Sequence, residues 1–350
     1  MIDYKAIQEN LVQDAENLKK GYDTLQEIGS VELAELPREL VWQQDKVKLY
    51  HYTRDTKAKS KVPVLVSYAL MNRPSVLDLQ KDRSMLARML DEGLDVYMID
   101  WGYPSKNDRY LTLGDYILGY WDEAIDHMRD THEVDSIHMV SICQAGTFSM
   151  IYASLNPEKV KTLTTIVSPF DFDVEGGMLY TWSKDIDVDS FADAYCTIPA
   201  PLLNTSFSML HPSLDIRKYF GIMKNLDNKE KLENFLRMEI WKADCPDLSS
   251  EMYRKYINDL FKNNLLIQGK FEIDGHTVDL KNITMPYLNI YATEDTIIPN
   301  ESTLNVMDYI GSKDSETFEI PGGHIGVFVG SRSQKLLAPK IAEFVIKRSK

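Results

Sequence analysis

A recurrent alternation of short apolar runs with longer amphipathic segments constrains the fold of this chain more than any other feature of its sequence. From residue 47 onward the apolar runs are mostly unbroken by polar residues, and the clearest stand at residues 62–70, 95–100, 136–141, 162–170 and 287–295. Such runs are typical of parallel strands that are buried on both faces. The segments between them, residues 111–130 for example, carry apolar residues at helical spacing. This alternation predicts an α/β fold with a mostly parallel central sheet and helices on both faces.

The alternation is interrupted between about residues 174 and 265, where helical and irregular patterns replace strand character. We therefore expect a cap or lid over residues 174–265, inserted into an α/β core formed by residues 31–173 and 266–350. The Asp-Gly pair at residues 274 and 275 predicts a hairpin that leads from the cap back to the sheet.

Residues 1–30 show a separate pattern, a single apolar stripe that a helix would place along one side. Its members are Tyr4, Ile7, Leu11, Ala15, Leu18, Tyr22, Leu25 and Ile28. The rest of that face is Glu, Gln, Asp and Lys, so the segment is predicted to be an amphipathic helix. Because it precedes the first strand, the stripe has two possible partners: the body of this chain, which we expect, or another chain.

The charge balance and the cysteine content limit the partners and the location of the protein. Lys and Arg number 39 against 53 Asp and Glu, a formal charge of −14, so the chain as a whole repels nucleic acid and anionic membranes. No apolar run approaches the roughly 18 residues of a membrane-spanning helix. The cysteines, Cys143, Cys196 and Cys245, are odd in number and include no CxxC pair, which argues against disulfides and a zinc site. We expect a soluble cytoplasmic protein, with Cys196 and Cys245 packed in its core.

Cys143 follows the predicted strand at residues 136–141 and precedes a helical pattern. This is the context of a nucleophile elbow, in which small residues two positions before and two positions after the nucleophile allow a sharp turn. Those positions hold Ser141 and Ala145, where glycine is usual. Taken alone, the stretch favours a buried structural cysteine over a nucleophile, because free cysteine is among the most buried residue types.

That interpretation changes when two much later residues, Asp295 and His324, are considered as well. Asp295 lies just past a predicted strand, where open α/β sheets present their functional groups, and His324 stands in a glycine-containing loop after the expected last strand. The chain order Cys143, Asp295, His324 is that of α/β-hydrolases. An imidazole beside a thiol favours the thiolate, which is the reactive form. We therefore interpret the three residues as a catalytic set for acyl transfer within an α/β-hydrolase fold.

Acyl transfer also needs hydrogen-bond donors for the oxyanion that forms when the carbonyl carbon is attacked. In this fold one donor is the backbone N–H of the residue after the nucleophile, here Gln144. The second comes from the loop after the strand at residues 62–70, and there we select the backbone N–H of Met71.

With these residues in place, the chain resembles the catalytic subunit of class III poly(3-hydroxyalkanoate) synthases, the two-component type for short acyl chains. The resemblance covers nearly the whole chain after the N-terminal helix. It rests on the stretches YALMNRPSVLDLQKDRS, DVYMIDWGYP, CQAGTFS, SPFDF, NFLRMEIW, DLFKNN, VDLKNIT and PGGHIGVFVGS. Asn-Arg-Pro in the oxyanion loop, Asp-Trp-Gly after a strand and a cysteine at the elbow would rarely coincide in an ordinary esterase.

The resemblance implies a role for each residue of the catalytic set. Cys143 would accept the acyl group of an (R)-3-hydroxyacyl-CoA, 3-hydroxybutyryl-CoA above all, and release CoA, with His324 as general base. Asp295 would either activate the 3-hydroxyl group of the substrate or orient His324. Two departures from the family pattern are the absence of glycine at Ser141 and Ala145 and the presence of Thr296, where histidine is common after the aspartate.

The resemblance also implies the setting in which the enzyme works. It implies a helical partner subunit, a place at the surface of cytoplasmic polyester granules, and no metal or prosthetic group, since CoA belongs to the substrate. A homo-oligomer is possible. The cap would cover the site, exclude water and provide a route for the product.

Two other functions are compatible with the same residues. The first is a cysteine-dependent hydrolase, a thioesterase or esterase, and the second is a noncatalytic scaffold that binds the granule or the partner. The products formed from 3-hydroxybutyryl-CoA distinguish the synthase from the hydrolase, and the effect of Cys143→Ala on CoA release tests the scaffold.

Overall fold

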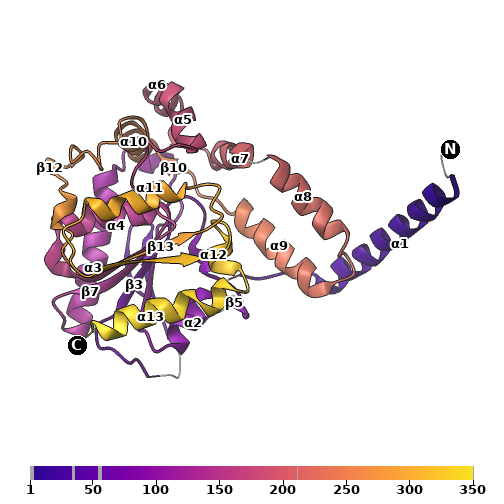
Figure 1. Ribbon diagram of the computed structural model, residues 1–350, viewed down its shortest axis with the longest axis horizontal. Helices are drawn as coiled ribbons and strands as arrows, with labels where there is room; N and C mark the ends of the chain where they lie inside the picture. The colour runs from indigo at the N-terminus through magenta and orange to yellow at the C-terminus, as the bar shows by residue number, and fades with distance from the viewer. Residues whose placement is uncertain (1–3, 34–35, 54–56, 211, 350) are drawn as a thin grey trace.

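The computed structural model describes residues 4–33, 36–53, 57–210 and 212–349, and its centre is an eight-stranded sheet (Figure 1). The strand order is β1-β2-β6-β3-β7-β8-β13-β14. Neighbouring strands from β6 to β14 run parallel, whereas β1 and β2 run antiparallel to their neighbours. The strands are β1 (Arg38–Gln44), β2 (Val47–Tyr52), β3 (Val64–Ser67), β6 (Val96–Asp100), β7 (Ile137–Ile142), β8 (Val160–Ile166), β13 (Tyr287–Ala292) and β14 (Ser315–Ile320). The predicted α/β class with a mostly parallel sheet is confirmed.

Helices cover both faces of the sheet and bury two apolar cores. One core holds side chains of α3 (Trp121–His132) and α4 (Gln144–Leu155), and the other holds side chains of α2 (Met85–Asp91) and α13 (Leu337–Lys347). Strands β3, β6 and β7 are buried at every position, which explains their unbroken apolar sequence. The edge strand β1 was not predicted, because most of its side chains are exposed and its apolar run, residues 40–42, is only three residues long.

Residues 178–262 follow β8 and precede β13 in the chain, and we call this mainly helical segment the cap. It comprises α5 (Met178–Asp185), α6 (Val188–Ala194), α7 (Ala200–Leu210), α8 (Pro212–Met223), α9 (Lys229–Ala243), α10 (Ser250–Lys255) and a π-helical turn at Tyr256–Lys262. The short pairs β9 (Thr197–Ile198) with β10 (Leu248–Ser249), β4 (Asp78–Gln80) with β5 (Arg83–Ser84), and β11 (Glu272–Ile273) with β12 (His276–Thr277) lie outside the main sheet. The last pair is the hairpin expected at the Asp-Gly turn, where residues 274 and 275 both have positive φ.

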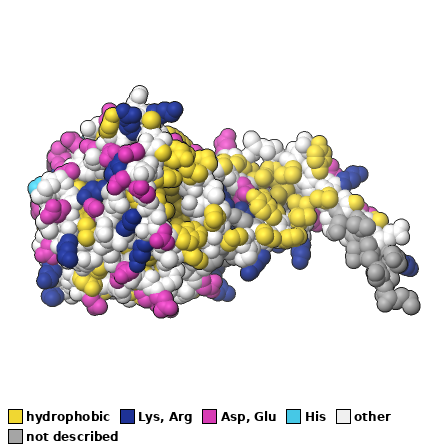
Figure 2. Space-filling model, turned by 90° about the horizontal axis from the view of Figure 1, so that it is seen from above, with side chains coloured by type: hydrophobic (Ala, Val, Ile, Leu, Met, Phe, Trp, Pro, Cys, Tyr) yellow, Lys and Arg dark blue, Asp and Glu magenta, His cyan; other side chains and the backbone are white. Residues whose placement is uncertain are grey.

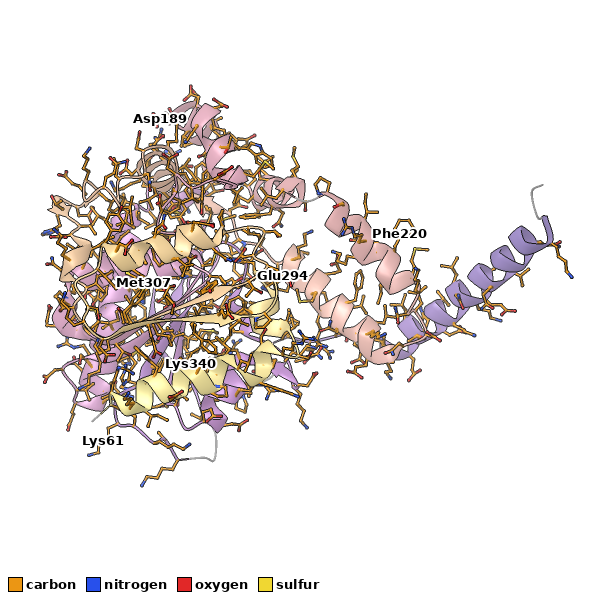
Figure 3. The ribbon with its side chains drawn as sticks, in the orientation of Figure 1. Lys61, Asp189, Phe220, Glu294, Met307 and Lys340 are labelled. Carbon is orange, nitrogen blue, oxygen red and sulfur yellow. The ribbon has the colours of Figure 1, made fainter. Side chains whose placement is uncertain are left out.

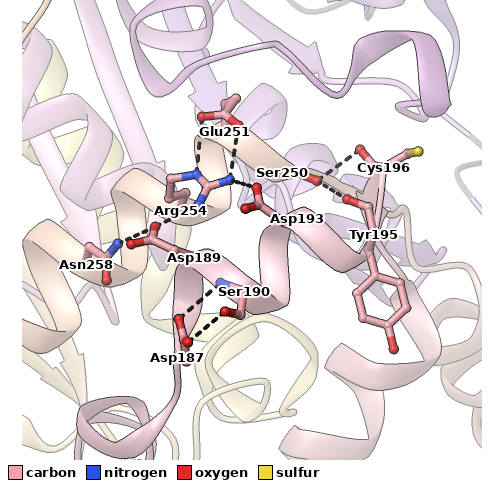
Figure 4. A network of polar contacts seen from close by, with 10 residues as sticks. All are labelled: Asp187, Asp189, Ser190, Asp193, Tyr195, Cys196, Ser250, Glu251, Arg254 and Asn258. Atoms are coloured by element: carbon pink, nitrogen blue, oxygen red, sulfur yellow. Dashed lines mark hydrogen bonds and ion pairs between the residues drawn. The ribbon is translucent and has the colours of Figure 1, made fainter.

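A network of ion pairs fastens α6 to α10 (Figure 4). Arg254 on α10 lies 2.7 Å from Asp189 and 2.6 Å from Asp193, both on α6, and 3.4 Å from Glu251 on its own helix. The hydroxyl of Ser250 donates to the carbonyl oxygen of Tyr195 at 2.7 Å. These contacts tie two cap helices that are distant in sequence into one unit.

Helices α8, α9 and α1 (Tyr4–Ile28) project from the body, and we call them the arm (Figure 1). Inside the arm, Gly21 lies against Leu226 so closely that a Cβ atom there would be 2.7 Å from the Leu226 Cβ, and Glu27 pairs with Lys229 at 2.6 Å. The expected packing of the α1 stripe on the body is not observed, because Leu18 is 56% exposed. Three stripe side chains, those of residues 4, 7 and 11, lie outside the described ones.

Large apolar side chains are exposed along the arm (Figure 2). On α8, Ile216 is 58% and Phe220 is 62% exposed, and Phe220 stands well away from the body in Figure 3. On α1, Tyr22 is 62% exposed. The arm therefore presents an apolar surface with no partner within the described part of the chain. Across that same part, no helix combines the length and the apolar composition needed to cross a membrane.

Candidate active site

Cys143 occupies a sharp turn between β7 and α4. Its φ is 56° and its ψ is −125°, a conformation that non-glycine residues rarely adopt and that is typical of the strained nucleophile elbow. Backbone hydrogen bonds hold the turn, since the Cys143 N–H donates to Ile166 at 2.9 Å and the Gly146 N–H donates to the Cys143 carbonyl oxygen at 2.9 Å. The thiol is thereby presented at the carboxyl end of the sheet, beside the first turn of α4.

The elbow closes without glycine at the two positions where the sequence departs from the usual pattern. Ser141 and Ala145 are both fully buried, with an exposed fraction of 0%. The position that does require glycine is Gly146, where a Cβ atom would lie 1.9 Å from the Ser168 hydroxyl oxygen. The close contact that constrains this elbow is therefore made one residue after the position that the sequence pattern highlights.

The structure brings the three predicted catalytic side chains together. The Nδ1 atom of His324 lies 2.7 Å from the Oδ2 atom of Asp295, and the two side chains are only 5% and 2% exposed. The other carboxylate oxygen of Asp295 accepts hydrogen bonds from the backbone N–H groups of Ile297 and Ile298, both at 2.9 Å. His324 and Cys143 line the same cavity, and the thiol is close enough to raise the pKa of the imidazole. A thiol, an imidazole and a carboxylate thus lie next to one another, which is the arrangement of a nucleophile, a base and an orienting group.

Two opposing effects act on the pKa of His324. Burial of the ring lowers it, whereas the charge of Asp295 and the interactions with Cys143 raise it, and the net result is a pKa of about 10. The structure therefore favours an imidazolium between the carboxylate and the sulfur. An adjacent imidazolium stabilises the thiolate form of a cysteine.

This raised pKa makes the contribution of His324 to stability depend on pH. A group whose pKa is higher in the folded protein stabilises fully below its unfolded value, here about 6.5, and loses that effect as the pH rises through the folded value of about 10. We expect the difference in unfolding free energy between the wild type and His324→Gln to shrink between pH 6.5 and pH 10, by on the order of 3 kcal/mol. Urea unfolding across this range measures it, and a difference that stays constant would contradict the raised pKa.

The predicted oxyanion donors lie at the same place. Gln144 is the first residue of α4, where backbone N–H groups have no partner within the helix. Its side-chain oxygen accepts from the backbone N–H of Leu70 at 3.1 Å, so the elbow and the oxyanion loop, residues 70–73, are joined directly. Within the described part of the chain, the Met71 N–H makes no hydrogen bond. Asn72 has a left-handed backbone, with φ of 62°, and its N–H interacts with Cys245. Met71 therefore stays the predicted second donor.

A cavity of about 220 Å³ lies over Cys143, between the sheet and the cap. Its lining is mainly apolar and aromatic. The body contributes Tyr68, Ala69, Met71, Asn72, Cys143, Gln144, Pro169, Ile297, Ile298, His324 and Ile325, and residues 178–262 contribute Leu179, Asn204, Phe207, Trp241, Lys242, Tyr256 and Phe261. Burial raises the pKa values of Tyr68 and Tyr256, so both phenols stay protonated near the thiol.

Sequence reasoning missed the cap side chains that close this cavity. Trp241 and Tyr256 were part of helical patterns and gave no chemical signal of their own. The core packing expected of Cys196 and Cys245 is wrong in both cases, because both are partly exposed. Among the described residues, no group of three or more His, Cys, Asp or Glu side chains is arranged to hold a metal ion.

The fold and the site together define an α/β hydrolase. The family model described as "alpha/beta hydrolase fold" matches residues 74–331. A monoacylglycerol lipase from Paleococcus ferrophilus superposes with a TM-score of 0.52 over 90% of this chain and 100% of the lipase, at 11% identity, which supports the fold alone.

The particular family follows from closer relatives. The poly(3-hydroxyalkanoate) polymerase subunit PhaC of Thiocystis violacea is 41% identical over 95% of this chain and 94% of the relative. The subunit of the same name from Allochromatium vinosum is 39% identical over 97% of each chain. This chain therefore belongs to the PhaC family of poly(3-hydroxyalkanoate) polymerase subunits, which are acyltransferases. The resemblance noted in the sequence is confirmed.

Proposed function

We propose that this chain polymerises (R)-3-hydroxyacyl-CoA into polyhydroxyalkanoate through a covalent acyl-enzyme on Cys143. The observation that carries the proposal is that Cys143, on the elbow of a PhaC family member, shares a cavity with His324, which is hydrogen-bonded to Asp295. In the first step the sulfur of Cys143 attacks the thioester carbonyl carbon. The new carbon–sulfur bond replaces the bond to CoA, and His324 passes the thiol proton to the departing CoA sulfur.

The backbone N–H groups of Gln144 and Met71 stabilise the oxyanion of this step. Donors that are fixed in position before the reaction cost little reorganisation, and each is worth about 10²–10³ in rate in enzymes of this kind. Chain growth follows when the 3-hydroxyl oxygen of another unit attacks an acyl thioester. The hydroxyl proton is taken up by the base, and the thiolate leaves.

Within this proposal Asp295 orients His324 and does not remove the hydroxyl proton itself. Both of its oxygens are occupied, one by His324 and the other by two backbone N–H groups. The carboxylate is also almost completely buried. His324, which faces the thiol, is better placed to accept the proton of the 3-hydroxyl group in the elongation step.

The cavity supports a short acyl group, with 3-hydroxybutyryl-CoA as the main substrate. Its volume of about 220 Å³ is below the 300–1,000 Å³ typical of sites for drug-sized ligands. Aromatic side chains limit it from the cap side, where Phe261 packs against Phe172 at 4.8 Å between ring centroids. The cap excludes water, which would otherwise hydrolyse the acyl-enzyme. No prosthetic group enters the proposal, because CoA arrives with the substrate.

The proposal includes the setting that the family resemblance implies. The exposed apolar surface of the arm supports the docking of a helical partner subunit, because amphipathic helices bind through such surfaces. It also includes a cytoplasmic location at the surface of polyester granules. A second copy of this chain, bound through its own arm, is the alternative occupant of the same surface.

Product analysis tests the proposed function. Purified protein, with and without its partner subunit, is incubated with 3-hydroxybutyryl-CoA, and CoA, polyester and free 3-hydroxybutyrate are measured. We expect polyester and CoA as products, with higher activity when the partner is present. Free hydroxy acid as the sole acyl product would instead identify a thioesterase, and binding without CoA release would identify a scaffold.

A further inference from the structure

A side chain of the cap reaches the loop that supplies the second oxyanion donor. Trp241, near the end of α9, is only 4% exposed and lines the cavity. Its indole N–H donates to the backbone carbonyl oxygen of Arg73 at 2.7 Å. Arg73 is the last residue of the oxyanion loop, and the hydrogen bond joins it to a helix 168 positions away in sequence.

The remaining contacts of this loop show what the tryptophan adds. At the start of the loop, the Leu70 N–H is held by the Gln144 side chain. At its end, the Arg73 guanidinium forms an ion pair with Asp100 and donates to the Gly102 carbonyl oxygen at 3.2 Å, so the side chain is fixed to the end of β6. The backbone of Arg73 is held by Trp241.

The loop between these anchors has an uncommon backbone. Asn72 has a positive φ of 62°, which is uncommon for residues other than glycine, although asparagine adopts it more readily than most. The direction of the Met71 N–H depends on the peptide units on either side of it. The hydrogen bond from Trp241 holds the carbonyl group of Arg73, two residues after Met71, and it therefore restricts where the Met71 N–H can point.

We propose that Trp241 is a positioning residue for acyl transfer, which fixes the oxyanion loop from the cap so that the Met71 N–H is aimed at the oxyanion. The inference rests on the proposed function, because it assumes that Cys143 is acylated. It makes the cap a part of the catalytic geometry as well as a cover. Since α9 is itself one of the arm helices, the packing of the arm against the body and the acylation rate are linked.

The test uses Trp241→Phe, which keeps an aromatic ring and removes the N–H donor. The full chain with its partner is mixed with excess 3-hydroxybutyryl-CoA, and the first turnover of CoA release is followed. We expect the acylation rate to fall about 10-fold, less than the 10²–10³ lost with a whole oxyanion donor. KM should change less than about 2-fold, because the loop acts on the transition state.

Trp121→Phe is the matched control. Trp121 is fully buried, and its indole N–H has no hydrogen-bond partner within the described part of the chain. The same chemical change at that position removes a comparable volume without removing a hydrogen bond. We expect the acylation rate of the folded Trp121→Phe protein to stay within about 2-fold of the wild type.

Alkylation of Cys143 by iodoacetamide separates positioning from general damage, because it needs no oxyanion hole. We expect Trp241→Phe to alkylate at the wild-type rate while it acylates slowly. Wild-type acylation in Trp241→Phe, or an equal loss of acylation and alkylation, would overturn the proposal. If the wild type releases free hydroxy acid instead of polyester, the proposed function fails but this comparison still holds, because acylation precedes both outcomes.

Discussion

Replacement of Cys143 by alanine is expected to abolish acyl transfer. The proposed covalent intermediate forms on this sulfur, and loss of the nucleophile in comparable enzymes costs about 10⁶ in rate. With 3-hydroxybutyryl-CoA as substrate, CoA release should fall by at least about 10³-fold, and no polyester should form. Mass spectrometry of the quenched wild-type protein should show one acyl adduct on Cys143, absent from the variant.

Cys196→Ala provides the control for this experiment. Cys196 is a partly exposed free thiol of the cap that does not line the cavity, so its removal should leave CoA release within about 2-fold of the wild type. An acyl adduct on Cys196, or CoA release by Cys143→Ala at the wild-type rate, would contradict the assignment of the nucleophile. Undiminished CoA release by Cys143→Ala would also favour the noncatalytic scaffold, in which the elbow takes no part in catalysis.

The parts of the fold that could be predicted are those in which burial leaves a pattern in the sequence. Strands such as β3 and β7 are covered on both faces, so their sequences are apolar throughout and easily recognised. Strand β1 pairs with β2 through its backbone, and most of its side chains are exposed, so its burial pattern is too weak to mark it as a strand. The arm shows the opposite case, since an apolar stripe predicted burial and the structure leaves much of α1 exposed.

The candidate site divides in a similar way. Cys143, Asp295 and His324 could be found because rare residue types stand at strand ends in a recognisable order, and the sheet brings strand ends together. Trp241 could not be found. Its partner is a backbone carbonyl group, which has no signature in the sequence, and the contact depends on how a separate helix packs.

The second large effect is expected for Asp295→Asn. The amide has the same shape and can still accept the hydrogen bonds from Ile297 and Ile298, but it carries no charge to stabilise the His324 imidazolium. Without that charge, burial should dominate and lower the pKa of His324 from its value of about 10. We expect kcat to fall by about 10²–10⁴, as for comparable changes in catalytic triads. Alkylation of Cys143 at pH 7 should slow as well, because the neutral ring no longer stabilises the thiolate.

The step that slows decides between the two roles of Asp295. If the carboxylate orients His324, single-turnover acylation and elongation both become slow in Asp295→Asn. If it only activated the 3-hydroxyl group, acylation would keep its wild-type rate and elongation alone would fail. Glu294→Gln removes one negative charge at the adjacent, exposed position (Figure 3), and it should leave both steps unchanged within about 2-fold. Because both oxygens of Asp295 are already occupied in the folded protein, the structure favours the slow acylation.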